Sequence, residues 1–102
     1  MTTTTDSFQP SYGNGITVAP SGTSASSTSV GDGAENVVIT NLSSSVIAYV
    51  RIGEGAQTAT TADYPVLPST QVSLTKGRYE STIAYITGGS TGSLHIIPGR
   101  GL

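Results

Sequence analysis

One segment of the sequence matches a catalytic motif, and it lies just before the only histidine. Gly88-Gly-Ser90-Thr-Gly92 fits the Gly-x-Ser-x-Gly pattern, in which a serine nucleophile sits on a tight turn from a strand into a helix. Here the following residues, 93–97, alternate polar and apolar side chains and predict a strand instead. No acidic residue lies between Ser90 and His95, although the hydrolase order requires one. We therefore interpret 88–92 as a glycine-rich hairpin loop and predict no catalytic residue.

His95 is the only histidine that could act as a general base or a metal ligand. It alternates with Leu94 and Ile96, so its side chain should point outward from a strand, as a surface or subunit-contact residue. A zinc site needs three or four ligands from His, Cys or carboxylates, and the chain has one His and no Cys. The sequence therefore predicts no zinc site and no enzymatic activity.

The carboxylates show no metal-binding spacing either. The chain has six of them: Asp6, Asp32, Glu35, Glu54, Asp63 and Glu80. A calcium loop needs several oxygen donors at alternating positions, and only Asp32 and Glu35 stand close together. Spacing alone leaves open a carboxylate pair for glycoside hydrolysis, although so short a chain offers little room for a cleft. We interpret these residues as turn and surface residues, and predict neither a metal nor a cofactor.

Composition excludes several classes of partner. The 102 residues include four Lys and Arg, six Asp and Glu, and no Trp, with a net charge of −2, so no basic patch for nucleic acid is expected. No apolar run approaches the roughly 20 residues that span a bilayer, and the N-terminus lacks the pattern of a secretion signal. The five Tyr are scattered and give little support to a sugar-stacking platform. Ser and Thr make up 31 residues and gather in the expected connections, which favours a hydroxyl-rich contact surface.

The apolar residues predict an all-β fold. Val and Ile, eight of each, dominate, and short apolar runs recur about every ten residues between Gly, Pro, Asn or Ser clusters. We expect a small β-sandwich or jelly-roll-like barrel of seven to eight strands in one domain, residues 15–102, preceded by an extended N-terminal arm, residues 1–14. A turn is expected at 31–33, and 21–29 is either an edge strand or a loop. The other expected strands are 15–19, 36–42, 46–52, an edge strand within 64–68, 70–75, 82–87 and 93–97.

Two of these strands carry apolar side chains on both faces. In each of the strands 46–52 and 82–87, apolar residues at alternate positions form one apolar face. The opposite face also carries an isoleucine, Ile47 in the first strand and Ile86 in the second. We therefore expect the second face to be covered, by a partner in so small a domain. The similar runs 45–50 and 81–86 reflect either duplication or, as we favour, convergence of two central strands on one packing demand.

The C-terminal two thirds of the chain resembles small virion structural proteins of tailed bacteriophages and prophages. The resemblance covers 36–102 and rests on four runs of sequence: Val50 to Pro68 (Val-Arg-Ile-Gly-Glu-Gly-Ala-Gln-Thr-Ala-Thr-Thr-Ala-Asp-Tyr-Pro-Val-Leu-Pro), Lys76-Gly77, Ile83-Ala84-Tyr85-Ile86, and Leu94-His95-Ile96-Ile97-Pro98-Gly99. It implies a head decoration or cement protein that binds the major capsid protein on the virion surface after synthesis in the host cytoplasm. A homo-oligomer, trimer or dimer, is expected with it. The alternatives are a small tail, neck or fibre-associated protein, and a receptor- or carbohydrate-binding β-sandwich.

Overall fold

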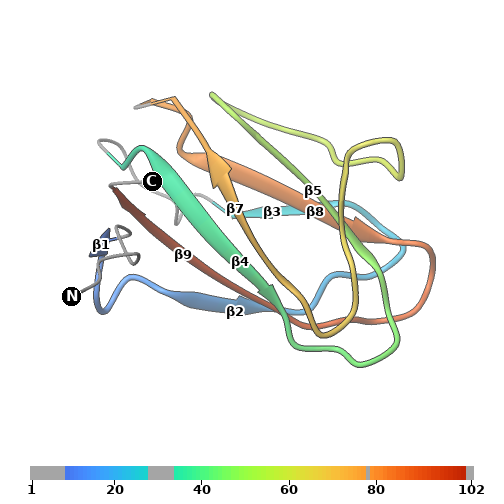
Figure 1. The fold of residues 1–102 in the computed structure, drawn as a ribbon. Helices are drawn as coiled ribbons and strands as arrows, with labels where there is room; N and C mark the ends of the chain where they lie inside the picture. Colours follow the sequence, from blue (N-terminus) through green and yellow to red (C-terminus); the bar gives the residue numbers. More distant parts are fainter. Residues whose placement is uncertain (1–8, 28–33, 78, 101–102) are drawn as a thin grey trace.

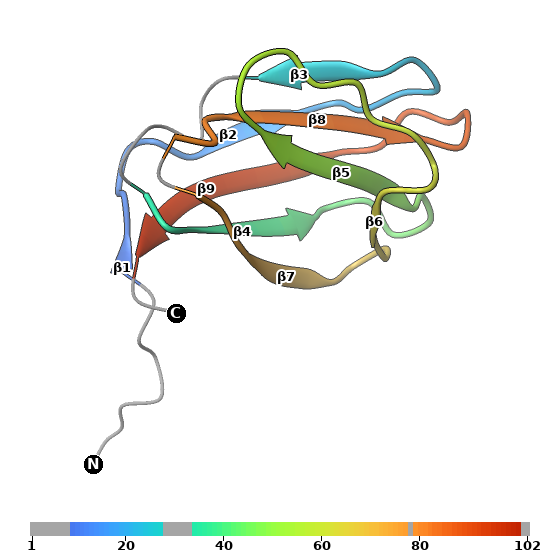
Figure 2. The same ribbon diagram turned by 90° about the horizontal axis from the view of Figure 1, so that it is seen from above.

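The chain forms two stacked antiparallel β-sheets. The computed structural model describes residues 9–27, 34–77 and 79–100, and every regular element in these ranges is a strand. One sheet has the order β1-β9-β4-β7, with β2 also paired to β9, and the other has the order β3-β8-β5-β6 (Figures 1 and 2). This confirms the prediction of an all-β sandwich. The strands are β1 (Gln9–Pro10), β2 (Ile16–Val18), β3 (Ala25–Ser27), β4 (Asn36–Asn41), β5 (Ala48–Gly53), β6 (Tyr64–Val66), β7 (Gln71–Thr75), β8 (Thr82–Thr87) and β9 (Leu94–Arg100).

The core lies between the two sheets and consists mainly of β-branched side chains. Strand alternation turns every second residue inward, and in β9 this buries Leu94 and Ile96 completely while His95 points outward, as the sequence predicts. Each fully buried aliphatic side chain contributes about 1.5–3 kcal/mol. The buried core residues are Val37, Ile39, Ala48, Val50, Val66, Ile83, Tyr85, Leu94 and Ile96.

Tyr85 is the only polar member of this core among the described residues, and it makes the fold sensitive to alkali. Burial raises the pKa of the Tyr85 phenol, because the phenolate would lose its hydration. The unfolded chain therefore ionises at lower pH than the folded one. We expect the ionisation of Tyr85 to leave stability unchanged below about pH 10 and to lower it as the pH rises further. In Tyr85→Phe this loss should shrink in urea unfolding curves measured between about pH 8 and pH 11, and an unchanged alkaline loss would contradict this explanation.

The last strand is longer than expected and contains a proline. We expected the strand to end at residue 97, with Pro98 closing the chain in a turn, but β9 continues to Arg100. The Leu42 amide donates to Ser93 O at 2.9 Å, and with the observed register this means that the odd-numbered residues of β9 bond to β4. Pro98 falls between these positions, so its missing N–H costs no bond to β4. The backbone of Pro98 faces instead the segment between β1 and β2, residues 11–15.

Part of the expected arm lies against this sheet. Gln9 and Pro10 pair with Arg100 and Gly99, and the Ser11 amide donates to Pro98 O at 2.9 Å. Residues 9–11 of the expected arm therefore pair with β9 of the same chain. Residues 1–8 of the expected arm, and the expected turn at 31–33, lie outside the described residues.

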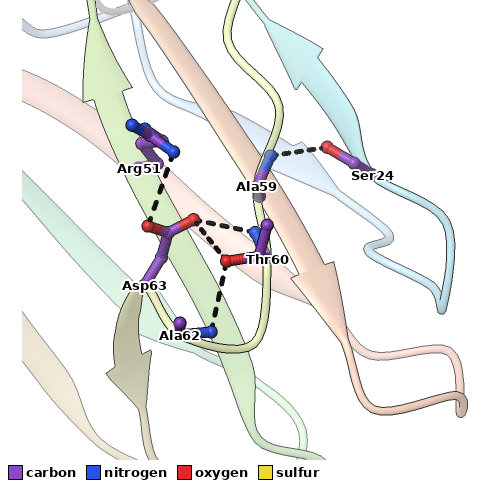
Figure 3. A network of polar contacts seen from close by, with 6 residues as sticks. All are labelled: Ser24, Arg51, Ala59, Thr60, Ala62 and Asp63. Carbon is purple, nitrogen blue, oxygen red and sulfur yellow. Dashed lines mark hydrogen bonds and ion pairs between the residues drawn. The ribbon is translucent and has the colours of Figure 1, made fainter.

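One connection crosses the outer face of the second sheet. The chain between β5 and β6 leaves β5, passes over β8 and reaches the edge at β3, where the Ala59 amide donates to Ser24 Oγ at 2.8 Å (Figure 3). Beneath it Ala84, which faces outward from β8, is fully buried, and Ala59 is almost so. We expected a partner to cover this second face, and the structure shows that the chain's own connection covers the half around Ala84. The other half, around Tyr49 and Ile86, remains half-buried.

A turn at residues 60–63 holds this connection in place. Asp63 Oδ2 accepts the Thr60 amide at 2.7 Å, and the Asp63 amide donates to Thr60 O at 3.1 Å. Arg51 Nη1 lies 3.9 Å from Asp63 Oδ1, but half of the Arg51 side chain is exposed, so this ion pair contributes little (Figure 3). The carboxylate therefore acts mainly as an acceptor for the turn.

We expect Asp63→Ala to release the connection without unfolding the sandwich. It should cost about 1 kcal/mol and accelerate hydrogen exchange at the Thr60 amide about 10-fold. The matched variant Asp63→Asn keeps an oxygen acceptor and loses only the ion pair, so it should cost less than about 0.5 kcal/mol. Equal damage in both variants would show that charge, rather than the turn, holds the connection.

Candidate binding surface at one end of the sandwich

Four connections meet at one end of the sandwich, which we call the loop end. Because neighbouring strands are antiparallel, alternate connections return to the same end. The loop end consists of the connections β2–β3, β4–β5, β6–β7 and β8–β9, which are residues 19–24, 42–47, 67–70 and 88–93. In β-sandwiches such loop clusters are common places for binding, because the sheets hold them rigidly.

Hydrogen bonds tie these connections to one another. The Gly92 amide donates to Pro20 O at 2.8 Å, which joins the β8–β9 and β2–β3 connections. There a Cβ at Gly22 would lie 3.1 Å from the Cα of Gly89, so the two backbones pack directly against each other. Gly89 has a φ of 149°, which side-chain-bearing residues rarely adopt. The glycines expected to form a hairpin loop thus also form a contact between two connections.

Asn41 is the central residue of the other half of the loop end. Its side chain is 2% exposed, and its amide nitrogen donates to Val46 O and to Val66 O, both at 2.9 Å. Its Oδ1 accepts the Ser43 amide at 3.0 Å. One buried amide thereby fixes the β4–β5 connection and the end of β6. The sequence predicted a strand that begins at Val46, whereas β5 begins at Ala48. The bond from Asn41 to Val46 O explains this difference.

The loop end carries no charged residue, and it exposes three aliphatic side chains. Leu42 is 55% exposed, Leu67 53% and Ile47 37%. The remaining residues of the four connections are mostly Ser, Thr, Gly and Pro. In the part of the chain that the structure describes, the charged residues all lie in the middle of the sandwich or toward its opposite end: Glu35, Arg51, Glu54, Asp63, Lys76, Glu80 and Arg100. Depletion of charge together with exposed apolar side chains is typical of the centre of a protein interface.

An open hollow of about 340 Å³ borders this surface on the outer face of the second sheet. The half-buried Tyr49 ring and the backbone of Gly88 and Gly89 line it, with the hydroxyls of Ser45 and Ser90 nearby. The hollow lies on the half of the sheet that the β5–β6 connection leaves uncovered. It offers an aromatic ring and hydroxyls but no charged group.

The residues of the rejected catalytic motif are not joined to the histidine. Ser90 is exposed in the loop end, whereas His95 lies on the outer face of the other sheet, beside the backbone of Gly15. A Cβ at Gly15 would lie 2.8 Å from His95 Nε2, so the imidazole packs on this glycine. No hydrogen bond links Ser90 with His95 within the described ranges. Their placement offers no nucleophile–base pair.

The described carboxylates take part in turns or face solvent. Glu80 Oε1 accepts the Gly77 amide, Asp63 closes the turn described above, and Glu35 and Glu54 are exposed. Asp32 and Asp6 lie outside the described residues. Within residues 9–27, 34–77 and 79–100, no group of three or more His, Cys, Asp or Glu side chains could hold a metal ion. These same ranges contain no helix that is long and apolar enough to cross a membrane.

Comparison with protein-family models, curated proteins and solved structures finds no match to this chain. The loop end therefore has to be interpreted from its own residues. Sequence reasoning expected a hydroxyl-rich contact surface in the connections but did not single out this end. A signal was present: the four connections of the loop end contain none of the ten charged residues, whereas the other connections contain seven of them.

Proposed function

We propose that this chain is a virion structural protein, a decoration protein that attaches to the head shell of a tailed bacteriophage through its loop end. The proposal combines the sequence resemblance of residues 36–102 with the charge distribution of the sandwich. The observation that carries it is the uncharged loop end with Leu42, Ile47 and Leu67 exposed. A rigid, apolar end and a charged opposite half suit a protein that sits on a larger protein surface with its charged half toward solvent.

Rigidity supports an attachment role. Asn41 and the glycine contact hold the connections before any partner binds, so little conformational entropy would be lost on docking. Many hydroxyl groups surround the three aliphatic side chains and suit direct or water-mediated hydrogen bonds at the rim of an interface.

The first test is the copy number of the protein in purified particles of the phage that encodes it. A decoration protein should be present in hundreds of copies, comparable to the major capsid protein. A dozen copies or fewer would assign it to the tail or neck, and its absence from purified particles would refute a virion role.

The second test asks whether the loop end is the attachment surface. Leu42→Asp and Leu67→Asp should each weaken binding of the purified protein to undecorated heads about 10-fold or more, because they place a charge where the interface excludes water. Tyr79→Asp is the matched control, since Tyr79 is 67% exposed near the opposite end. If Tyr79→Asp weakens binding and the two leucine variants do not, the attachment surface lies elsewhere.

The hollow favours a second candidate function, carbohydrate binding. Tyr49 could stack on a sugar ring while Ser45 and Ser90 contact its hydroxyls. Screening the protein on a glycan array, with Tyr49→Ala as a control, tests this. Binding that Tyr49→Ala abolishes would support the receptor-binding alternative, and an array without signal would reject it.

A further inference from the structure

The free edge of β7 lacks the features that usually protect an edge strand. Among the described strands that end a sheet, β1, β2, β3 and β6 are two or three residues long, and β6 also contains Pro65. β7 has five residues, Gln-Val-Ser-Leu-Thr, and contains neither a charge nor a proline. Short length, charge and proline are the usual means by which sheets avoid pairing with other chains. Figure 2 shows β7 at the rim of the sandwich, next to β4.

The bonds at the two ends of β7 determine which backbone groups are free. The Asn41 amide donates to Thr70 O, and the Lys76 amide donates to Glu35 O. With the observed β4–β7 register, the even-numbered residues of β7 therefore bond to β4. The N–H and C=O groups of Gln71, Ser73 and Thr75 face away from β4, and within the described ranges they make no hydrogen bond.

We propose that two copies of this chain associate through β7, antiparallel about a two-fold axis at Ser73, and join two sheets into one. In this register Ser73 pairs with Ser73 of the second copy, and Gln71 pairs with Thr75. All outward-facing backbone groups of both strands are then satisfied by six hydrogen bonds. Val72 and Leu74, which pack against the core, continue the apolar inner face across the junction. The inference is independent of the proposed function, because it concerns the isolated protein.

The surroundings of β7 fit a second copy better than an unrelated strand. The strand has no charge, so its own copy brings no like charge opposite it. Tyr64 of β6 and Leu67 of the β6–β7 connection, 49% and 53% exposed, belong to the segment that leads directly into β7, and Figure 2 shows β6 and β7 at the same rim of the sandwich. A second copy brings an identical pair of apolar side chains to that side, and a two-fold axis is the commonest symmetry for such self-contacts.

Disulfide trapping tests the register, because the chain has no cysteine of its own. In the proposed dimer the two Ser73 Cα atoms lie about 5.5 Å apart, within disulfide range. Ser73→Cys should therefore form a covalent dimer rapidly under mild oxidation. Thr75→Cys, on the same strand and face, is the matched control: its two copies would lie about 14 Å apart and should not couple. A Thr75→Cys dimer that forms as fast as the Ser73→Cys dimer overturns the register.

Charge substitution tests the interface itself. By analytical ultracentrifugation from micromolar to millimolar concentration, the unmodified protein should dimerise. Ser73→Lys alone and Ser73→Glu alone should each weaken the dimer at least 10-fold, and an equimolar mixture of S73K and S73E should restore it. Ser26→Lys, exposed on edge strand β3, should leave it unchanged. A monomer throughout this range, or a dimer that tolerates S73K, overturns the proposal.

Discussion

Replacing Asn41 with alanine is expected to lower the free energy of unfolding by about 3–5 kcal/mol. Three hydrogen bonds are lost: the buried carbonyl of Val66 loses its bond to the side-chain amide, and so do the part-buried carbonyl of Val46 and the part-buried amide of Ser43. A buried group left unsatisfied costs about 1–3 kcal/mol, and each of the two part-buried bonds, whose partners water can reach, costs about 1 kcal/mol. Because domains of this size are stable by only about 5–15 kcal/mol, the midpoint of thermal unfolding should fall by roughly 15 °C or more.

Circular dichroism during heating measures this effect, and Gln71→Ala provides the control. Gln71 also uses its side-chain amide in a hydrogen bond, to Thr40 Oγ1 at 2.8 Å, but it is exposed. Its loss should cost about 1 kcal/mol or less, since water replaces the partner. Equal losses in the two variants would mean that Asn41 does not organise the loop end. Asn41→Asp keeps the shape but turns two donors into acceptors that face carbonyls, so it should be at least as destabilising as Asn41→Ala at neutral pH.

The same residue shows why the loop end was harder to predict than the strands. The run from Val46 to Ile52 alternates like a strand, and periodicity alone places its start at residue 46. The bond from Asn41 to Val46 O draws that residue into the connection instead. Sequence patterns report local preference, whereas this boundary depends on a buried amide five residues away.

Periodicity also left undecided which face of a two-sided strand points inward. The runs 45–50 and 81–86 are similar in sequence, and we expected both to form central strands that pack in the same way. In the structure Ala48 is in the core and Tyr49 faces outward, whereas Ala84 faces outward and Tyr85 is in the core. The matched residues therefore have opposite roles. The register between the two strands determines this: Val50 lies opposite Tyr85, so even-numbered residues of β5 share a face with odd-numbered residues of β8.

Where one face of a strand is clearly apolar, the sequence predicts orientation well, and β9 allows a sharp test of this. Ile96 and Ile97 are adjacent and chemically identical, but Ile96 is fully buried in the core and Ile97 is half-buried on the outer face. Ile96→Ala should cost about 3–4 kcal/mol, because it removes core contacts and leaves a cavity between the sheets. Ile97→Ala should cost about 1 kcal/mol, since it removes only partly buried surface.

Urea unfolding of both variants measures this difference directly. Both changes remove the same atoms from neighbouring positions of one strand, so differences in strand propensity cancel. A shift of β9 by one residue would exchange the two faces and reverse the order of the losses. It would also turn His95 into the core, where its polar imidazole would be buried. A larger loss for Ile96→Ala therefore tests the inward face of β9 and the outward position of His95 together.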